Sequence, residues 1–284
     1  GYNEIITYSF TSPSAFDQIR LPKDSPLRNC LRIQNPLGED TSVMRTIALP
    51  SMMDILARNS AYHNKAAKFY EIAKVYLPTE GQVLPQEPKK LLLGTYGAGE
   101  TFFTLKGEIE AILKGLRVLP VEYTAEKSNP SYHPGRCAVL SIDGENVGVM
   151  GQVHPLVVKN YGMDCEVYCA ELNLSRLMQL RLPDPTYTPL PKYPAVTRDL
   201  ALVCDEDVTV AQAEKVIAAA AGKLLRDVRL FDIYRGTGVP TGKKSMAFSL
   251  ELRSDERTLT DSDSEGVMNK VLSALKNDLN AVLR

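Results

Sequence analysis

The stretch Leu200-Ala201-Leu202-Val203-Cys204, followed by Thr209-Val210-Ala211-Gln212, decides the fold of the second part of the chain. A short, continuously apolar run of this kind predicts a buried strand. A threonine with a glutamine three residues later is a capping box, which predicts the start of a helix. Apolar residues then recur at helical spacing up to Gly222, which is expected to end the helix: Val210, Ala213, Val216, Ile217 and Ala220.

The residues that follow complete one recognisable unit. Residues 228–235 predict a second strand and residues 236–242 a turn, after which Met246, Phe248, Leu250 and Leu252 alternate with smaller or polar residues. We interpret Ser262-Asp263-Ser264-Glu265 as a second capping box before an apolar helical stripe, and residues 279–283 as a last short strand. The order β-α-β-β-α-β is the ferredoxin-like pattern.

Proline marks the boundary before this unit. Five prolines fall within residues 181–194, and they leave few backbone donors and favour extended conformations. We therefore predict a first domain at residues 1–182, a linker at residues 183–191 and a second domain at residues 192–284.

The first domain mixes strands and helices. Strands are predicted at residues 5–10, 69–76, 90–97 and 167–172, and a hairpin joins residues 138–142 to 148–152 around Asp143-Gly144. Helices are predicted at residues 50–59, with Pro50 in the first turn, and at residues 104–115. A surface loop or long hairpin is expected at residues 78–89. Many strands joined by short turns favour an antiparallel sheet with flanking helices, class α+β.

Composition excludes several kinds of protein. The chain has 33 Lys and Arg against 34 Asp and Glu, so any nucleic-acid or membrane site must be a local patch. No apolar run reaches the ~18 residues of a membrane span. The five cysteines, an odd number, indicate reduced thiols and a cytoplasmic location. Because residues 1–4 resemble neither a natural start nor a signal peptide, we expect part of a longer protein.

Three histidine and cysteine patterns could be chemical sites, but the sequence disfavours each of them. His133 and Cys137 could form a nucleophilic pair, but Pro134-Gly135 prevents a shared helical face. Cys165 and Cys169 are interpreted as buried thiols rather than zinc ligands, since no second ligand pair lies nearby. His154 is interpreted as a capping or packing residue.

The glycine-rich stretch Gly94-Thr95-Tyr96-Gly97-Ala98-Gly99 lacks the spacing of a phosphate loop. We predict that it is a loop between strands.

One further pattern could bind RNA. Arg229, Phe231 and Arg235 share one strand parity, and Lys243-Lys244 follow the turn. Aromatic and cationic side chains together suit stacking on unpaired bases. From spacing alone, however, a core Phe231 with a solvated charged rim is favoured.

Several segments taken together resemble the β subunit of bacterial phenylalanyl-tRNA synthetases, and the resemblance covers essentially the whole chain. In the first domain they are GYNEIITYSF (1–10), NPLGEDTSVMRT (35–46), FYEIAKVY (69–76), LKG (105–107), HPGR (133–136) and GVMGQVHP (148–155). In the second they are YPAVTRD (193–199), FDIY (231–234) and RTLTD (257–261).

The resemblance implies a class II synthetase-like core followed by a ferredoxin-fold anticodon-binding domain. Active class II synthetases follow the strand matching residues 69–76 with an arginine that clamps the ATP α-phosphate. Here Leu77 stands at that place, and no later glycine-rich segment supplies a second catalytic arginine. The core is therefore expected to be non-catalytic, with no catalytic residue and no metal ligand.

The resemblance also implies a function. The chain would be the C-terminal part of the β subunit of a heterotetrameric phenylalanine–tRNA ligase, whose whole enzyme uses ATP and magnesium while this part carries no cofactor. Its expected partners are the catalytic α subunit and tRNA. The alternatives are a free-standing RNA-binding adaptor and, from the residues alone, a hydrolase built on Cys137 and His133.

Two sets of residues are assigned to these partners. Met52, Met53 and Ile55 are assigned to the α-subunit interface, with core packing as the equal alternative. RNA binding is assigned to Arg198, Phe231, Tyr234, Arg235, Lys243 and Lys244. Because only one parity of a strand is exposed, one of the two aromatic residues is expected to lie in the core. Lys243 and Lys244 are expected on opposite faces.

Overall fold

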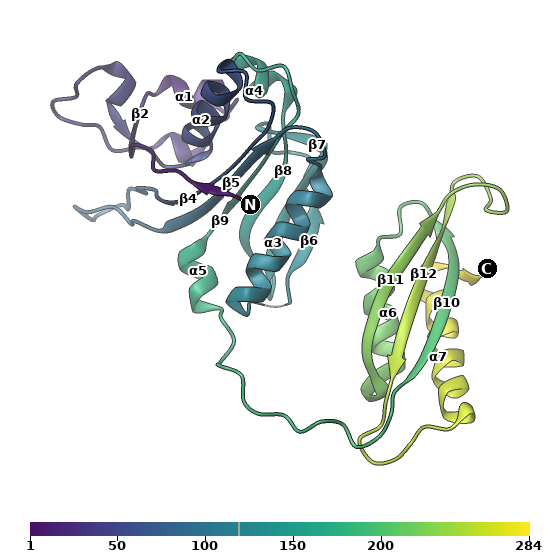
Figure 1. Ribbon diagram of the computed structural model, residues 1–284. Helices are drawn as coiled ribbons and strands as arrows, with labels where there is room; N and C mark the ends of the chain where they lie inside the picture. The colour runs from purple at the N-terminus through teal and green to yellow at the C-terminus, as the bar shows by residue number, and fades with distance from the viewer. Residues whose placement is uncertain (119) are drawn as a thin grey trace. The chain divides into compact units, whose positions relative to one another are not determined.

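The chain divides into two compact units in the computed structural model, which describes residues 1–118 and 120–284 (Figure 1). The first unit is Gly1–Asp184 and the second is Pro185–Arg284. Residues 181–191, in the proline-rich stretch, belong to no helix or strand. Among the described residues, no helix combines the length and the apolar character that crossing a membrane would require.

The first unit is built on one large sheet. Its strands are β1 (Asn3–Glu4), β4 (Ala67–Lys74), β5 (Lys89–Tyr96), β6 (Glu122–Ala125), β7 (Tyr132–Ile142), β8 (Glu145–Val153) and β9 (Val167–Leu172), with β2 (Phe10–Thr11) and β3 (Val43–Met44) paired separately. Its α-helices are α1 (Ser14–Gln18), α2 (Leu49–Ala61), α3 (Phe102–Leu116), α4 (Pro155–Asn160) and α5 (Leu174–Gln179), and its short 3-10 helices are η1 (Pro26–Arg28) and η2 (Glu39–Thr41).

The large sheet has the strand order β1-β4-β5-β9-β8-β7-β6. All neighbours in it are antiparallel except β1 and β4, which run parallel. The sequence therefore predicted the α+β class and the antiparallel character correctly, apart from this edge strand. Figure 1 shows helices on both faces of the sheet.

Alternation along β5 shows how the two faces are filled. Leu92 faces the core that contains α2, whereas Leu91 and Leu93 face the core that contains α3. Gly94 lies beneath α2, and a Cβ atom there would stand 2.6 Å from the Met52 side chain. The absence of a side chain at Gly94 thus lets α2 pack directly on the sheet.

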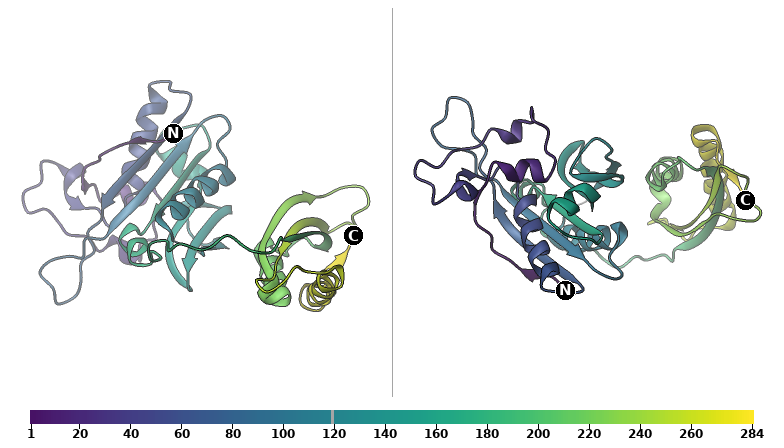
Figure 2. Two further views of the ribbon diagram at one scale, coloured as in Figure 1. Left: turned by 60° about the horizontal axis from the view of Figure 1, so that its bottom comes forward. Right: turned by 90° about the horizontal axis from the view of Figure 1, so that it is seen from above.

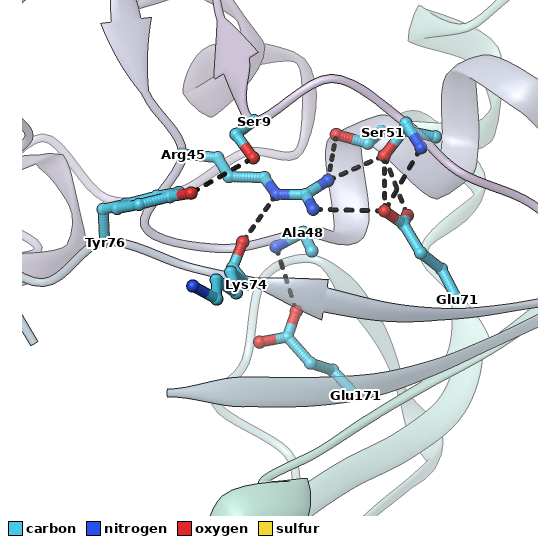
Figure 3. A network of polar contacts seen from close by, with 9 residues as sticks. Ser9, Arg45, Ala48, Ser51, Glu71, Lys74, Tyr76 and Glu171 are labelled. Carbon is cyan, nitrogen blue, oxygen red and sulfur yellow. Dashed lines mark hydrogen bonds and ion pairs between the residues drawn. The ribbon is translucent and has the colours of Figure 1, made fainter. Parts of the chain in front are cut away.

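A buried ion pair joins three segments of the first unit (Figure 3). Arg45 and Glu71 are 2% and 3% exposed, and Arg45 Nη2 lies 3.1 Å from Glu71 Oε1. Arg45 Nε donates to the Lys74 carbonyl at 2.8 Å, and its Nη1 donates to the Thr7 hydroxyl at 2.7 Å. Thr7 in turn donates its backbone N–H to Glu71. The pair holds the chain near residues 7 and 45 against β4.

Several local predictions for the first unit are confirmed, and two are wrong. The strands β4, β5 and β9, the helices α2 and α3 and the β7–β8 hairpin all form at the predicted places. Residues 5–9, predicted as a strand, form only hydrogen bonds at the sheet edge, such as Ile5 N–H to the Tyr70 carbonyl at 2.9 Å. The glycine-rich stretch does not join two strands: Gly94 lies within β5, and Gly97 and Gly99 precede α3.

The second unit has the predicted β-α-β-β-α-β order. Its elements are β10 (Val196–Asp205), α6 (Val210–Ala221), the short 3-10 helix η3 (Gly222–Leu224), β11 (Leu225–Tyr234), β12 (Lys243–Leu252), α7 (Asp261–Leu279) and β13 (Val282–Leu283). The strand order is β11-β12-β10-β13, and α6 and α7 cover one face of the sheet (Figure 2).

Both helices of this unit begin at capping boxes. Thr209 and Gln212 cap α6 as predicted, and Gly222 follows its last residue. The box at α7 was predicted in the wrong place: Thr260 and Asp263 form it, so the helix begins one residue before Ser262. The Asp263 carboxylate accepts hydrogen bonds from both the N–H and the hydroxyl of Thr260. Thr260 is therefore the N-cap, the position that the sequence assigned to Ser262.

The buried ion pair yields the first prediction. Replacing Glu71→Gln leaves the Arg45 guanidinium buried without a counter-charge, which costs about 3–5 kcal/mol of unfolding free energy. Chemical denaturation of the first unit measures this loss. The matched control is Glu87→Gln, whose pair with Lys74 is 43% and 49% exposed and is worth at most about 1 kcal/mol. Equal effects of the two substitutions would contradict the prediction.

Candidate nucleic-acid interface

The sheet of the second unit has one face that its own helices do not cover. Leu200 pairs with Phe248 and Leu202 with Met246, and all four belong to the core shared with α6 and α7. Directly paired residues point to the same side, so the residues between them point to the other side. We call that second side the uncovered face.

Small side chains form the centre of the uncovered face. The register places these residues there: Ala201, Val203, Ser245, Ala247 and Ser249. Ser245 and Val203 are only 3% and 7% exposed although no helix of the unit packs on them. Tyr234 pairs with Ser245, and the Arg284 guanidinium lies 4.9 Å from the Tyr234 ring centroid. The centre is therefore flat and is bordered at one end by an aromatic ring stacked with a cation.

The other end of the uncovered face is a shallow hollow of about 200 Å³, lined by Thr197, Asp227, Arg229, Ser249 and Glu251. Asp199 and Asp232 lie on the same face between the two ends. The face thus carries more carboxylates than cations. Such a surface offers a ring for stacking and acceptors for base amino groups, rather than a dense array of phosphate contacts.

Phe231 and Tyr234 are both exposed, at 55% and 36%, so the expectation that one of them lies in the core is wrong. The reason is an irregularity in the ladder: Leu230 pairs with Phe248 but Asp232 pairs with the next residue, Ala247. Phe231 is the extra residue of this bulge, which interrupts strict alternation along the strand. Leu230 and Ile233 therefore both face the helices although they are three residues apart.

Arg198 does not lie on the uncovered face. It pairs with Leu250 on the helix side, and its Nη2 lies 2.8 Å from the Asp261 carboxylate and 2.9 Å from the Ser264 hydroxyl at the start of α7. In the same turn, Arg257 forms an ion pair with Asp263. The hydrogen bonds from Arg257 hold the pKa of the Asp263 carboxyl well below its usual range. Arg198 therefore stabilises the N-terminus of α7.

The three remaining predicted cations meet at the end of β10. Arg235 pairs with Glu206 at 2.6 Å and Lys243 pairs with Asp205 at 2.8 Å. The hydrogen bond from Arg235 lowers the pKa of Glu206. Lys244 is 8% exposed, and its Nζ donates to the Glu206 carbonyl at 2.8 Å. The expected opposite faces are confirmed, but Lys244 is on the helix side and does not present its ammonium to a phosphate.

The six RNA-binding candidates consequently do not form one surface. Tyr234 and Lys243 lie on the uncovered face, Arg235 follows the end of β11, and Phe231 is the exposed bulge residue. Arg198 and Lys244 are engaged on the helix side at opposite ends of the sheet.

The partner-interface candidates also need correction. Met52 and Met53 are 0% exposed and belong to the core beneath α2, while Ile55 is partly exposed. Core packing is thus the correct alternative for the two methionines, because their helix lies on the sheet. Exposed apolar side chains occur instead beside the edge strand, where Ile6 is 91% and Tyr8 is 80% exposed.

The histidine and cysteine patterns of the first unit do not form a nucleophilic pair or a metal cluster in its described part, although Cys165 is exposed rather than buried as predicted. His133 Nδ1 accepts the Gly135 N–H at 3.0 Å, and burial raises the pKa of the Cys137 thiol to about 12. A protonated thiol is a poor nucleophile. His154 is the N-cap of α4 and accepts the Leu156 N–H, as predicted. No group of three or more His, Cys, Asp or Glu within residues 1–118 and 120–284 is arranged to hold a metal.

Two family models match the chain and together account for both units. Residues 1–174 match the phenylalanyl-tRNA synthetase beta chain CLM domain, and residues 191–284 match the ferredoxin-fold anticodon binding domain. The chain belongs to the phenylalanyl-tRNA synthetase β-chain family.

Known members of the phenylalanyl-tRNA synthetase β-chain family are similar over the whole chain. The phenylalanine–tRNA ligase beta subunit of Clostridium acetobutylicum is 45% identical over 285 residues, which are 100% of this chain and 36% of that protein. The beta subunits of Clostridium tetani and Moorella thermoacetica are 44% and 39% identical, with the same coverage. The chain therefore spans about a third of the length of these relatives.

The sequence patterns did not predict two parts of the uncovered face, which are Arg284 and the hollow that contains Arg229. Arg284 stacks on Tyr234, 50 positions earlier, because β13 pairs with β10 and brings residue 284 beside Ala201, whose carbonyl accepts the Arg284 N–H at 3.0 Å. The hollow with Arg229 depends on register between three strands. The small residues at alternating positions of β12 are the sequence pattern that could have indicated a flat, uncovered sheet face.

The two neighbouring lysines yield the second prediction. Lys244→Ala removes a hydrogen bond to a carbonyl and a buried aliphatic stem, so it lowers the unfolding free energy of the second unit by about 1–3 kcal/mol. Lys243→Ala removes only a partly exposed ion pair and costs less than about 1 kcal/mol. Chemical denaturation, monitored at backbone amides of the second unit, measures the change in unfolding free energy for both variants. A larger loss for Lys243→Ala than for Lys244→Ala would show that the assignment of faces is wrong.

Proposed function

We propose that this chain works within the β subunit of a phenylalanine–tRNA ligase as a structural and RNA-binding part. The first unit acts as a non-catalytic class II synthetase-like core that packs on the catalytic α subunit. The second unit binds the anticodon stem-loop of tRNA. The observation that carries this proposal is the uncovered face of the second unit, in a domain that matches the anticodon-binding family model.

The uncovered face suits unpaired bases. A base can lie on the partly exposed small residues Ala201 and Ala247 and stack against the Tyr234 ring, because the side chains at these two positions are short. The carboxylates of Asp199 and Asp232 can accept hydrogen bonds from base amino groups. Since the local cations are paired with acids, few phosphates are neutralised and the salt dependence of binding is shallow.

At residue 77, where active class II synthetases have an arginine that clamps the ATP α-phosphate, this chain has a leucine. Leu77 forms an isolated bridge with Gln86 and packs at the edge of the core. The nearby Arg45 guanidinium is saturated by Glu71, Thr7 and the Lys74 carbonyl. The residues at this position therefore do not fit ATP and magnesium, which supports the proposal that this chain holds neither.

We infer that the α-subunit contact involves the sheet edge rather than α2. Ile6 and Tyr8 flank Thr7, whose bonds to Glu71 fix this segment against β4. Their side chains are held at the surface by a rigid support, and exposed apolar side chains in such a position are typical of protein interfaces.

The third prediction tests RNA binding. Tyr234→Leu in the 284-residue chain removes a stacking surface and weakens binding of a phenylalanine tRNA anticodon stem-loop by about 1–3 kcal/mol. Fluorescence titration at two salt concentrations measures both the affinity and its salt slope. The control is Tyr187→Leu, since Tyr187 is 88% exposed in the proline-rich stretch. Wild-type affinity in the Tyr234 variant, or a salt slope as steep as that of a basic RNA-binding domain, would refute the proposed face.

The fourth prediction concerns catalysis. The chain alone produces no phenylalanine-dependent exchange of pyrophosphate into ATP, because Leu77 supplies no charge to the α-phosphate. The assay uses protein freed of host synthetase by a second affinity step, with a mock purification as control. Exchange that follows the chain through that step would overturn the assignment of a non-catalytic core.

A further inference from the structure

A cavity of about 500 Å³ opens on the α2 side of the large sheet of the first unit, and neither Arg45 nor Glu71 lines it. Its floor includes Val149 of β8 and Glu171 of β9, which pair directly and therefore point to the same side. Its walls include Leu21, Leu27 and Leu49, which are apolar. A cavity of this size accommodates a small molecule.

Two opposite charges in this cavity lack an ion-pair partner. Glu171 accepts the Ala48 N–H through Oε2 at 3.2 Å, and Figure 3 shows its other oxygen directed away from that bond. Within residues 1–118 and 120–284, only the backbone N–H groups of Ala48 and Leu49 donate to the Glu171 carboxylate, and no side chain does. In the same part of the chain, no ion pair or hydrogen bond reaches Lys90 Nζ, which lines the cavity. Lys90 lies on the same face as Glu171, because it is two residues from Leu92, the partner of Glu171.

Two asparagine side chains in the cavity use their oxygen atoms but not their N–H groups in hydrogen bonds within the chain. The side-chain oxygens of Asn146 and Asn173 accept backbone N–H groups at 2.9 and 3.2 Å, which leaves their amide N–H groups as donors. Glu126 Oε1 accepts three hydrogen bonds from Ser128 and Asn129, and the resulting pKa lies below the usual value. The cavity thus offers carboxylates for a cation, and a lysine and amides for an anion.

We propose that this cavity binds a small zwitterion with an apolar body, of the free amino-acid class. Glu171 Oε1 binds the ammonium group, Lys90 binds the carboxylate, and the leucine-rich wall packs on the apolar body. Burial raises the pKa of Glu171, with Lys90 acting in the opposite direction, so a bound ammonium would supply the counter-charge that the protein does not provide in contact. This site is independent of RNA binding by the second unit.

The fifth prediction tests this site with three small molecules that share the branched side chain of leucine and differ in their charged groups. L-leucine carries both charges, 3-methylbutylamine lacks the carboxylate and 4-methylpentanoate lacks the ammonium. Ligand-observed NMR titration of the 284-residue chain is expected to show saturable binding of leucine, and binding about tenfold or more weaker for each truncated probe. No saturable leucine binding overturns the proposal. Equal binding of the amine or of the acid overturns the zwitterion assignment.

Matched variants separate binding from folding. Glu171→Gln keeps an acceptor for the Ala48 N–H, and Lys90→Met keeps the aliphatic stem, and each is expected to weaken leucine binding about tenfold or more. The controls are Glu122→Gln on exposed β6 and Lys89→Met, which points to the opposite face of β5. Thermal unfolding of every variant verifies the fold. Undiminished binding in folded Lys90→Met protein, or an equal loss in Lys89→Met protein, contradicts the site, whatever the outcome of the RNA titration.

Discussion

The buried pair of Arg45 and Glu71 is the constraint on which the architecture of the first unit depends. Two charges at 2% and 3% exposure are tolerated only when their hydrogen-bonding capacity is filled, and here the partners come from distant segments. Thr7 brings the N-terminal segment to the sheet edge, and the Lys74 carbonyl fixes the end of β4. Arg45 lies four residues before Leu49, the first residue of α2, so the pair also fixes the segment that leads into that helix. The position of α2 then decides what lies beneath it, including the cavity at Glu171.

In the second unit the corresponding constraint is strand register. Ten consecutive pairs join β10 to β12, and each pair assigns two residues to one face. One face is closed by α6 and α7, while the other is built from alanine, serine and valine, which cannot form a second core. A sheet face that is flat and lacks large apolar residues is stable in water yet open to planar ligands. The acids at its margin pair with the available cations, so shape and stacking contribute more to recognition than net charge does.

Sequence patterns predicted what depends on neighbours along the chain. Thr209 with Gln212 marked a helix start, and the alternation from Met246 to Leu252 marked a strand with one buried face, because capping and pleating are local. The bulge at Phe231 was missed because it depends on how β11 pairs with β12. Arg45 and Glu71 are 26 positions apart, and nothing near either residue indicates burial. Lys244 was misjudged for a similar reason: a lysine at a core-facing position is unusual, and only the Glu206 carbonyl explains it.

The α2 face of the sheet contains a direct comparison between a satisfied and an unsatisfied carboxylate. Glu71 and Glu171 both pair with Leu92, from opposite sides, so they lie in one row across three strands. Glu71 receives the Arg45 guanidinium and two donors from Thr7, whereas Glu171 receives only backbone N–H groups, those of Ala48 and Leu49 at the start of α2. Burial consequently dominates at Glu171 and raises its pKa despite the more distant Lys90 and Arg45. Two equivalent positions in one row thus have different electrostatic balances, and the difference lies in whether the protein itself supplies the cation.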